Sequence, residues 1–519
     1  MARPLSLPSG ARALVIGVVT LAVACYLGAL ANGFAWDDMP IVADNTLVHG
    51  VSGLWRAFAM PYWPPAAGGY LYRPLVVATY ALDWLVAPAG AWWFHGVNVL
   101  WHAGASTAVA LLARRWAGDA AGWLAGALFA VHPVHVEAVA NVVGRAELMA
   151  AVFSVLAVWL AVARDSLAGS AAAWTLALLA KENAAVVPAL VGAAWLLGFP
   201  RPPARRIAAY AIVWCLIGID YALVRQAVFG PYPVSSGVAV VFLDQSPLMV
   251  RLTAVAALAD IARLLVFPLT LRADYSPKER TAVTGFGDPR FLAGLACLAL
   301  WAALLWLLAR RQRRVEALGV AWIGIALAPV ANLLFTVGVL VAERTLYFPS
   351  VGLALAAGAG FAAWWAGAAT RVRRIAGVAT VTLIAAGGLR TALRVPVWKS
   401  TETVYQSVLR DSPRSYFGPM VGARYAERDG RYADALDGFR RAARIMPADN
   451  RMSLRAAELA YRLNRPAVAD TLLAHIDSTC IHCETFFEAA AIEARTRGQT
   501  VVADSLLRHL EALKAARRP

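Results

Sequence analysis

Several ionisable side chains stand beside long apolar runs of this chain. They are Asp37, Asp38, His132, His135, Glu137, Arg145 and Glu147. A charge in or beside a membrane segment is costly, so residues of this kind mark a functional site by default. The sequence therefore predicts a polar site at the ends of the apolar runs, and the order of the runs decides which side chains meet.

Two adjacent carboxylates, Asp37 and Asp38, follow the first apolar run. Such a pair suits a general base that deprotonates a hydroxyl group, because a neighbouring carboxylate or an aromatic lid raises the pKa of the base toward the working range. Adjacent aspartates are also common in solvated loops, so a plain loop turn is the alternative interpretation.

A second group consists of His132, His135 and Glu137. The two histidines are three residues apart and would share one face of a helix, whereas Glu137 would point elsewhere. The spacing lacks the HExxH form of zinc proteases, so histidines satisfied by hydrogen bonds at the interface are the alternative to a metal site. A divalent cation is compatible with the sequence, but no ligand set demands one and no metal ligand is assigned.

Cations form the third group. The planar fork of Arg145 suits a phosphate, and Lys181, beside Glu182 in an apolar stretch, could act as a point-charge phosphate ligand. Glu343 and Arg344, followed by Tyr347, repeat this pattern. For each pair, a purely structural ion pair is the alternative. Further candidates for the lining of the site are Arg73, His95 and His102.

Composition places these residues in a membrane protein. The chain has 519 residues, of which 60% are hydrophobic and 15% charged, and its mean hydropathy is +0.59. Apolar runs of about twenty residues recur, each long enough to cross a bilayer. The net charge of +16 fits cytoplasmic arginines and an arginine-rich tail. No nucleic-acid recognition motif is present, so we expect a lipid bilayer and no nucleic acid as partners.

The arginines predict a topology. Arg3 and Arg12 keep the N-terminus cytoplasmic, so the Asp37–Asp38 pair emerges outside. We expect about eleven crossings, with a break at Lys181. An interfacial helix is expected over 74–86, and 252–271 should lie in the interface or re-enter. The expected spans are 13–31, 92–113, 120–136, 148–163, two short helices within 171–199, 207–228, 291–309, 317–337, 346–366 and 375–393.

The chain changes character after residue 397. Gly430, Asn464 and Gly498 follow one another at intervals of 34 residues, which is the period of tetratricopeptide repeats, each a helix pair closed by a turn. We expect a membrane domain over 1–397 and an extracytoplasmic α-solenoid of about three repeats over 398–519. Such arrays bind proteins or peptides; a small helical cap without a ligand is the alternative. Cys480 and Cys483 could form a disulfide in an oxidising compartment.

The motifs together resemble the protein O-mannosyltransferases with transmembrane and tetratricopeptide repeats, within the GT-C class of multispanning glycosyltransferases that use lipid-linked sugars. The resemblance covers nearly the whole chain in order. It is carried by Phe34-Ala35-Trp36-Asp37-Asp38, Tyr72-Arg73-Pro74-Leu75, Phe94-His95-Gly96-Val97-Asn98, His132–Glu137, Asn141–Glu147, Lys181-Glu182, Ala273-Asp274-Tyr275-Ser276 and Ala342–Ser350.

The resemblance implies inverting transfer of a hexose, typically mannose, from a polyprenyl-phosphate carrier to a protein hydroxyl. It implies that Asp37 or Asp38 is the base and that Arg145, Lys181 and Arg344 hold the donor phosphate. The acceptor protein would dock on the repeats. The Ala- and Arg-rich composition points to a bacterial inner-membrane protein that uses undecaprenyl phosphate, with its site and repeats periplasmic. The remaining candidates line the cleft: Arg73, His95, His102, His132, His135, Glu137, Glu147, Glu182, Glu343 and Tyr347.

Two other functions compete with transfer. A non-catalytic membrane scaffold would recruit partners through the repeats, and its charged cluster would be dispensable. A transporter or lipid flippase would need a polar pathway through the whole membrane, yet the expected topology gathers the charged motifs on one face. The glycosyltransferase hypothesis therefore accounts for more of the chain than either alternative.

Overall fold

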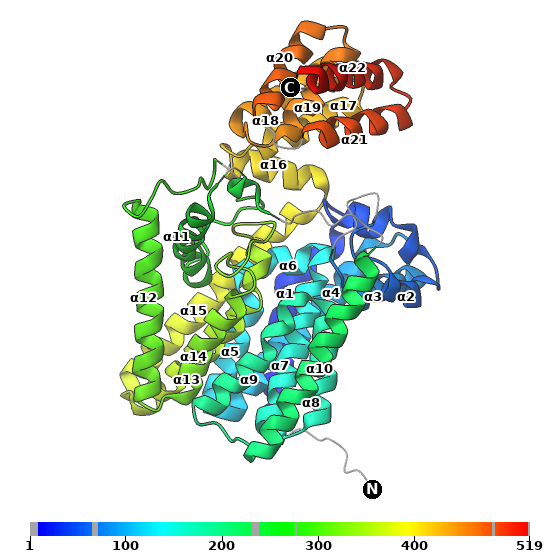
Figure 1. Cartoon of the computed structure of the whole chain (residues 1–519). Helices are drawn as coiled ribbons and strands as arrows, with labels where there is room; N and C mark the ends of the chain where they lie inside the picture. The colour runs from blue at the N-terminus through cyan, green and yellow to red at the C-terminus, as the bar shows by residue number, and fades with distance from the viewer. Residues whose placement is uncertain are drawn as a thin grey trace. The chain divides into compact units, whose positions relative to one another are not determined.

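The structure, a computed structural model, describes residues 9–64, 71–230, 238–243, 245–275, 278–479 and 483–516. No strand occurs among the described residues, so the expected all-α class is confirmed (Figure 1). Arg3, Ser276 and Cys480 lie outside the described ranges, and with them the proposed disulfide.

Two compact units divide the chain. The first comprises Met1–Gly237, Arg251–Ala273 and Val283–Val404, and the second comprises Val238–Val250, Asp274–Ala282 and Tyr405–Pro519. In addition to the C-terminal region, the second unit thus takes in two segments that lie between α10 (Ala204–Phe229) and α12 (Pro289–Arg310) in the chain. A boundary placed where the apolar runs end leaves these segments in the first unit. Short loops carry no sequence pattern that would assign them to the second unit.

Seven described helices of the first unit are long and apolar enough to cross a membrane, and an eighth is added if a pair bent by 47° counts as one span. The chain is therefore a multi-pass membrane protein. The seven are Gly10–Ala31 (α1, Ser9–Tyr26, with η1, Leu27–Ala31), α4 (Ala91–Ala117), Val142–Arg164 (η7, Val142–Gly144, with α7, Arg145–Arg164), α10 (Ala204–Phe229), α12 (Pro289–Arg310), α14 (Pro349–Gly367) and Thr370–Trp398 (α15, Thr370–Arg394, with η11, Val395–Trp398). The bent pair is α5 (Asp119–Val131) and Pro133–Ala140, which contains η6 (Pro133–His135) and α6 (Val136–Ala140).

The described part of the chain contains fewer full-length spans than the expected crossings. The expected span over 317–337 is wrong, because α13 (Arg314–Leu327) ends before Pro329. Proline has no N–H for the helix ladder and its ring clashes with the preceding turn. The two short helices expected within 171–199 are present as α8 (Leu167–Ala180) and α9 (Val187–Leu196), with the break at Lys181.

Two further expected helices are present, the first with the expected ends and the second with shifted ends. The segment 74–86 is α3 (Pro74–Val86), and Pro74 begins it at the position where proline suits a helix. The interrupted apolar segment 252–271 corresponds to α11 (Pro247–Val266), which is not among the helices that meet the criteria for a span.

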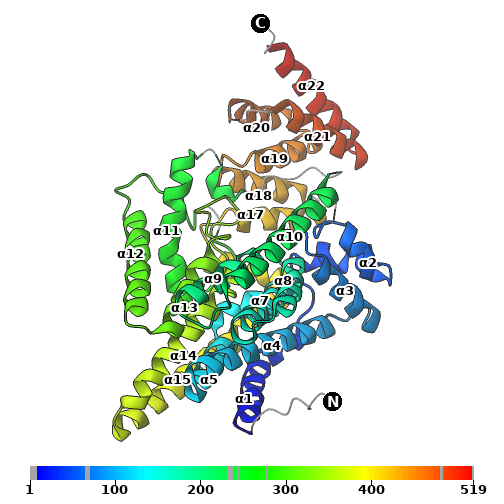
Figure 2. The same cartoon turned by 60° about the horizontal axis from the view of Figure 1, so that its bottom comes forward.

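Small residues allow the inner helices of the first unit to pack closely. A Cβ atom on Gly352 of α14 would lie 2.3 Å from the carbonyl oxygen of Gly319 of α13, and one on Gly358 would lie 2.7 Å from that of Ala121 of α5. Contacts between small residues are the usual way in which membrane helices approach. They make α5, α13 and α14 a rigid frame (Figure 2).

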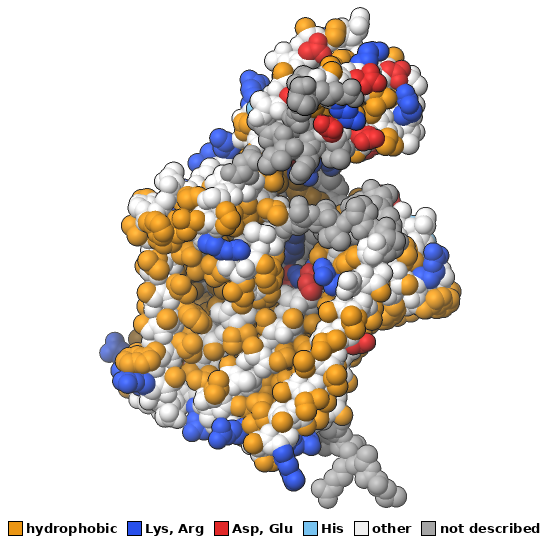
Figure 3. Space-filling view, viewed as in Figure 1, with side chains coloured by type: hydrophobic (Ala, Val, Ile, Leu, Met, Phe, Trp, Pro, Cys, Tyr) orange, Lys and Arg blue, Asp and Glu red, His pale blue; other side chains and the backbone are white. Residues whose placement is uncertain are grey.

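The outer helices show the opposite pattern. Large apolar side chains are exposed along α10, α12 and α15, and they colour most of the visible face in Figure 3. Examples are Leu216, Leu223, Leu300, Leu304, Val381 and Leu389. An apolar surface of this extent marks a membrane contact. Lys and Arg side chains gather at the lower edge of the same view, the end at which Gly10 of α1 lies beside the guanidinium of Arg114.

The second unit contains three consecutive helix pairs, in each of which the two helices pack together, and the first pair also packs on the second. Gly430, Asn464 and Gly498 have positive φ angles of 77°, 56° and 73° at the turns between paired helices, as residues that end helices do. The turns thus occur at the expected interval, while the assignment to tetratricopeptide repeats stays a prediction. The helices are α17 (Phe417–Arg428), α18 (Tyr432–Ile445), α19 (Asn450–Arg462), α20 (Pro466–Thr479), α21 (Cys483–Thr496) and α22 (Thr500–Ala516).

Candidate active site

The loop after η1 carries both aspartates, and its backbone is held at several points. Trp36 adopts a φ of 54°, which is uncommon for a bulky residue and is found where surrounding contacts impose it. Its N–H donates to the hydroxyl of Thr401, 2.9 Å away. Met39 to Ala43 form a single wide turn, η2 (Met39–Ala43), directly after the aspartates. The backbone therefore gives Asp37 and Asp38 defined and different directions.

Asp38 is fully buried and points into the protein. Its carboxylate accepts hydrogen bonds from the N–H groups of Ala35 (3.1 Å), Val142 (3.4 Å) and Val143 (2.9 Å). Burial raises the pKa of Asp38 to about 7, while the three N–H groups act in the opposite direction. Asp38 thus fastens the first loop to the segment before α7.

Asp37 differs from its neighbour. Its side chain is partly exposed, and no hydrogen bond or ion pair to the carboxylate exists among the described residues. Burial raises the pKa of Asp37, the charge of Arg344 lowers it, and Glu137 raises it again. A partly buried carboxylate with a raised pKa and free lone pairs is what a general base requires.

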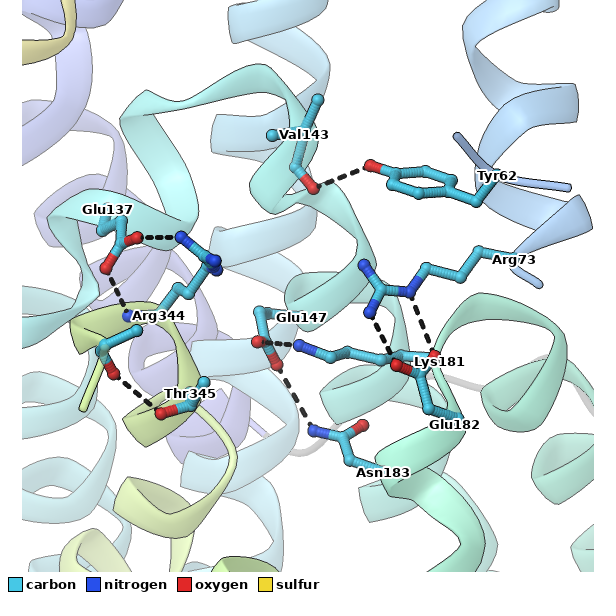
Figure 4. Close-up of polar contacts among 11 residues, drawn as sticks. Tyr62, Arg73, Glu137, Val143, Glu147, Lys181, Glu182, Asn183, Arg344 and Thr345 are labelled. Carbon is cyan, nitrogen blue, oxygen red and sulfur yellow. Dashed lines mark hydrogen bonds and ion pairs between the residues drawn. The ribbon is translucent and has the colours of Figure 1, made fainter. Parts of the chain in front are cut away.

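Arg344 stands beside Asp37 and is held by Glu137. Arg344 belongs to η10 (Glu343–Leu346), and Glu137 belongs to α6. The Glu137 carboxylate pairs with Nη1 of Arg344 and accepts the backbone N–H of Arg344 at 2.8 Å (Figure 4). The Arg344 side chain remains 34% exposed and Glu137 only 3%. The Nε and Nη2 groups of Arg344 bind nothing else among the described residues, so they can receive an anion.

Lys181 and Arg73 are two further cations of this region, and each pairs with a buried or half-buried carboxylate. Lys181, at the break between α8 and α9, forms an ion pair with Glu147 of α7. Arg73, just before α3, binds both oxygens of Glu182 through Nε (3.1 Å) and Nη2 (2.7 Å) (Figure 4). Each cation keeps N–H groups that its carboxylate does not use. Three arms of the chain therefore bring cations to one region.

Two neutral residues that the sequence analysis did not single out take part here. The Tyr62 ring lies under the Arg73 guanidinium, 5.0 Å from ring centroid to Cζ, and its hydroxyl donates to the carbonyl oxygen of Val143 at 3.4 Å. The Asn183 amide donates to the Glu147 carboxylate at 3.4 Å. Asn183 directly follows Lys181-Glu182, which was a usable signal, whereas nothing near Tyr62 in the sequence points to Arg73.

The structure does not support a phosphate-binding role for Arg145. Its guanidinium is fully buried and pairs with Asp83 at 2.5 Å. It also donates to the Asn98 side chain at 2.8 Å, to the Phe94 carbonyl at 3.1 Å and to the Thr79 hydroxyl at 3.2 Å. With these donors engaged inside the helix bundle, Arg145 ties α3 and α4 to α7. The planar fork that suits a phosphate also suits this set of internal acceptors, and sequence cannot separate the two.

The histidines and Tyr347 also lie within the first unit, and His132 among them is partly exposed. His95, His102, His135 and Tyr347 are fully buried. His102 bridges the Ala130 carbonyl (3.0 Å) and the Tyr347 hydroxyl (2.8 Å), and the rings of His132 and His135 lie 5.2 Å apart. The two rings are therefore close, as expected of residues three apart, but they do not share one helix, because α5 ends at Val131 ahead of Pro133.

Glu343 is buried and accepts the backbone N–H of Arg272 at 2.5 Å. It therefore holds the chain before α12 against η10. Among the described residues, no three His, Cys, Asp or Glu side chains are placed to hold a metal ion.

The site thus contains the Asp37 carboxylate, which pairs with no described residue, beside Arg344. Lys181 and Arg73, which also retain unused N–H groups, lie in the same region as Arg344 (Figure 4). The whole chain is similar in sequence to several known proteins. The chain is similar to protein O-mannosyl-transferases. Protein O-mannosyl-transferase TMTC3 of Mus musculus is 26% identical over 500 residues, which cover 87% of this chain and 53% of the relative. Protein O-mannosyl-transferase TMTC4 of Homo sapiens is 27% identical over 466 residues, covering 77% and 62%.

The chain spans about half the length of the TMTC3 relatives that it matches. No protein-family model matches it. Among solved structures, the crystal structure of ArnT from Cupriavidus metallidurans bound to undecaprenyl phosphate aligns with a TM-score of 0.40 and 14% identity, covering 98% of this chain and 76% of ArnT. The resemblance to protein O-mannosyltransferases, which rested on separate motifs, is therefore confirmed over most of the chain.

Proposed function

We propose that the chain is a glycosyltransferase that moves a hexose, mannose by analogy with its relatives, from a polyprenyl-phosphate carrier to a Ser or Thr hydroxyl of a protein. The observation that carries the proposal is the unpaired carboxylate of Asp37 beside the Arg344–Glu137 pair. The relatives' names supply the type of transfer, and the local chemistry supplies the roles.

Asp37 acts as the general base in this proposal. It takes the proton of the acceptor hydroxyl while the hydroxyl oxygen attacks the anomeric carbon of the sugar. The bond from that carbon to the phosphate oxygen breaks on the opposite side, so the configuration inverts. The polyprenyl phosphate leaves with the bonding electrons and gains negative charge. No covalent sugar–protein intermediate is needed, because one displacement completes the transfer.

The cations stabilise the leaving phosphate. Arg344, Lys181 and Arg73 are each held by a carboxylate on one side and keep N–H groups for a second anion on the other. Donors fixed before the reaction stabilise developing charge without reorganising, and this is usually the largest contribution to catalysis. We assign the phosphate to these three cations, so that Arg73 takes the place that the sequence suggested for Arg145.

The site is expected on the extracytoplasmic side. Asp37 follows the C-terminal end of α1, and the arginines of the α4–α5 turn lie beside the N-terminal end of the same helix. Cytoplasmic loops of membrane proteins are enriched in Lys and Arg, so the opposite end, where Asp37 is found, faces outward.

A transfer assay tests the proposal. Purified full-length protein in liposomes is supplied with a panel of radiolabelled polyprenyl-phosphate sugars and a Ser/Thr-rich polypeptide. Label in the polypeptide is expected with wild type and with Asp44→Ala, an exposed aspartate in the same loop. We expect Asp37→Asn to reduce the rate by about 10²- to 10⁴-fold, the usual contribution of a general base. Full activity of Asp37→Asn would refute the role of Asp37, and absence of label with every donor would favour the scaffold.

A further inference from the structure

The second unit carries an arginine that forms no direct ion pair with a described residue. Arg424 of α17 is exposed and has no hydrogen bond or ion pair with any described residue. Its neighbours on the adjacent helix are also arginines: Arg455 of α19 binds Glu427 of α17 through Nε (3.2 Å) and Nη2. Arg424 stands one turn before Glu427, and Arg451 stands one turn before Arg455. The bridge therefore sets Arg424 opposite Arg451.

The electrostatics agree with this placement. Partial burial and the charges of Arg451 and Arg455 lower the pKa of Arg424, whereas Tyr416 and Glu427 raise it. Arg451 and Arg455 have partners of their own, Asp449 for the first and Glu427 with Glu458 for the second. Tyr416, at the start of α17, lies close enough for both Arg424 and Arg451 to act on its hydroxyl. The carboxylates near Arg424 are thus engaged by the other two arginines, and like charges held close together favour the binding of a further anion.

We propose that Arg424, with Arg451 and Tyr416, forms a binding subsite for a carboxylate of an acidic polypeptide segment. A guanidinium fork binds a carboxylate through two parallel hydrogen bonds, and the Tyr416 hydroxyl supplies a third donor. The neighbouring carboxylates decide the kind of partner. Glu458 and Glu427 lie within the same row of charges and would repel a polyanion, whereas a peptide can place one acidic side chain at Arg424 and neutral ones beside the glutamates.

The consequence for transfer rests on the proposed function: acceptors with an Asp or Glu near the modified hydroxyl would be preferred. Binding itself does not depend on it and is measured separately. The probe is a fluorescein-labelled peptide of Gly, Ser and Thr with three Asp residues, and its comparison peptide carries Asn at the same places. Fluorescence anisotropy with full-length protein in nanodiscs gives the two affinities.

We expect wild type to bind the Asp peptide at least about tenfold more tightly than the Asn peptide, as a hydrogen bond to a charged group allows. Arg424→Gln should abolish this difference while leaving thermal stability unchanged or higher, because a repulsion is removed. Arg444→Gln, an exposed arginine of α18, is the matched control and should keep the difference. Equal affinity of wild type for the two peptides would overturn the proposal, and so would tighter binding of heparin than of the Asp peptide.

A separate observation concerns the loop that carries Asp37. Three hydrogen bonds tie it to the segment after α15: Asn32 Nδ2 donates to the Val395 carbonyl (3.3 Å), the Gly33 N–H to the Lys399 carbonyl (2.9 Å), and the Trp36 N–H to the Thr401 hydroxyl (2.9 Å). The last contact fixes the residue directly before Asp37 in its left-handed conformation. Thr401 is also the first residue of α16 (Thr401–Asp411), which continues the chain into the second unit.

We infer that Thr401 is a positioning residue for Asp37 in the proposed transfer. Its hydroxyl holds the Trp36 N–H, and the resulting backbone direction turns the Asp37 carboxylate toward Arg344. Thr401→Val removes the hydroxyl without changing the shape of the side chain, and Thr401→Ser keeps the hydroxyl.

We expect Thr401→Val to lower kcat about tenfold with little change in KM and to displace the acid limb of the pH–rate profile, since Asp37 moves relative to Arg344. Thr401→Ser should restore both quantities. In the Asp37→Asn background, Thr401→Val should cost nothing further, because coupled residues are not additive. An unchanged pH profile in Thr401→Val, or additive losses in the double variant, would overturn the inference. Failure of Asp37→Asn to slow transfer would instead refute the proposed function.

Discussion

Arg145 provides the sharpest test of how the structure divides the cations. Arg145 and Glu147 are two residues apart, yet the Arg145 guanidinium pairs with Asp83 inside the protein, with their side chains 0% and 6% exposed. Arg145→Gln leaves the Asp83 carboxylate buried without a cation. Removing one partner of a buried pair costs about 3–5 kcal/mol, because the remaining charge is uncompensated.

The loss is measurable by chemical unfolding of the detergent-solubilised protein, followed by tryptophan fluorescence. Arg145→Gln should lower the free energy of unfolding by about that amount, and Asp83→Asn combined with Arg145→Met should recover most of it, because neither charge then remains. Arg206→Gln is the matched control. Its pair with Asp165 is nearly half exposed on both sides, so a change of about 0–1 kcal/mol is expected.

The opposite outcome is equally definite. If Arg145→Gln kept its stability, expressed normally and raised the KM for the lipid-linked donor, then Arg145 would hold the phosphate and the reasoning from burial would be refuted. The structural role predicts the reverse pattern, in which the surviving folded fraction binds the donor with unchanged affinity.

Three further outcomes are expected. Arg344→Gln should move the acid limb of the pH–rate profile to higher pH, because Arg344 lowers the pKa of Asp37 and a base loses activity as the pH falls through its pKa; an unmoved limb would contradict this. Burial raises the pKa of Asp38 to about 7 from about 4 in the unfolded chain. The folded state then binds more protons than the unfolded state, so the free energy of unfolding should fall as the pH rises from about 4 to 7. Wild type should be less stable at pH 7.5 than at pH 5, and this difference should be absent in Asp38→Asn. A Cβ atom on Gly144 would lie 2.1 Å from the Ala138 carbonyl oxygen. Gly144→Ala should therefore lower the melting temperature and displace the N–H groups that hold Asp38. A Cβ atom on Gly104 would meet nothing within 4 Å, so Gly104→Ala should leave the melting temperature unchanged.

The two aspartates show where sequence reasoning reaches its limit. As neighbours in one motif they are equivalent candidates for the base. The structure separates them because Trp36 has an unusual backbone angle and because the N–H groups of Val142 and Val143, about a hundred residues away in the chain, converge on Asp38. Neither fact has a local signal, so only the tertiary contacts leave Asp37 as the available carboxylate.

The cations illustrate the same distinction. Arg145, Lys181, Arg344 and Arg73 were all identified as charged residues beside apolar runs. Whether such a residue points to a ligand or to an internal partner depends on which carboxylate lies across from it. Asp83 belongs to a different helix from Arg145, and Glu182 to a different one from Arg73, so those pairings emerge only when the helices pack.

Some features needed no tertiary information. Apolar runs of bilayer length determine that the chain crosses a membrane, since backbone groups in lipid must be satisfied within helices. The break at Lys181 follows from a charge pair in an apolar stretch, and the turns at Gly430 and Asn464 follow from a fixed interval of residues that tolerate positive φ. These are properties of short segments, which depend on local backbone and solvent energetics.

The tertiary structure decided which ionisable groups are available for chemistry. The sequence determined the helices, the polar ends of the spans and the supply of carboxylates and cations. It did not determine that Asp38 and Arg145 are engaged by internal hydrogen bonds, while Asp37 and one side of Arg344 stay open. An ionisable group is available for chemistry only if no internal hydrogen-bond partner engages it, and the internal partners are set by the packing of the whole protein.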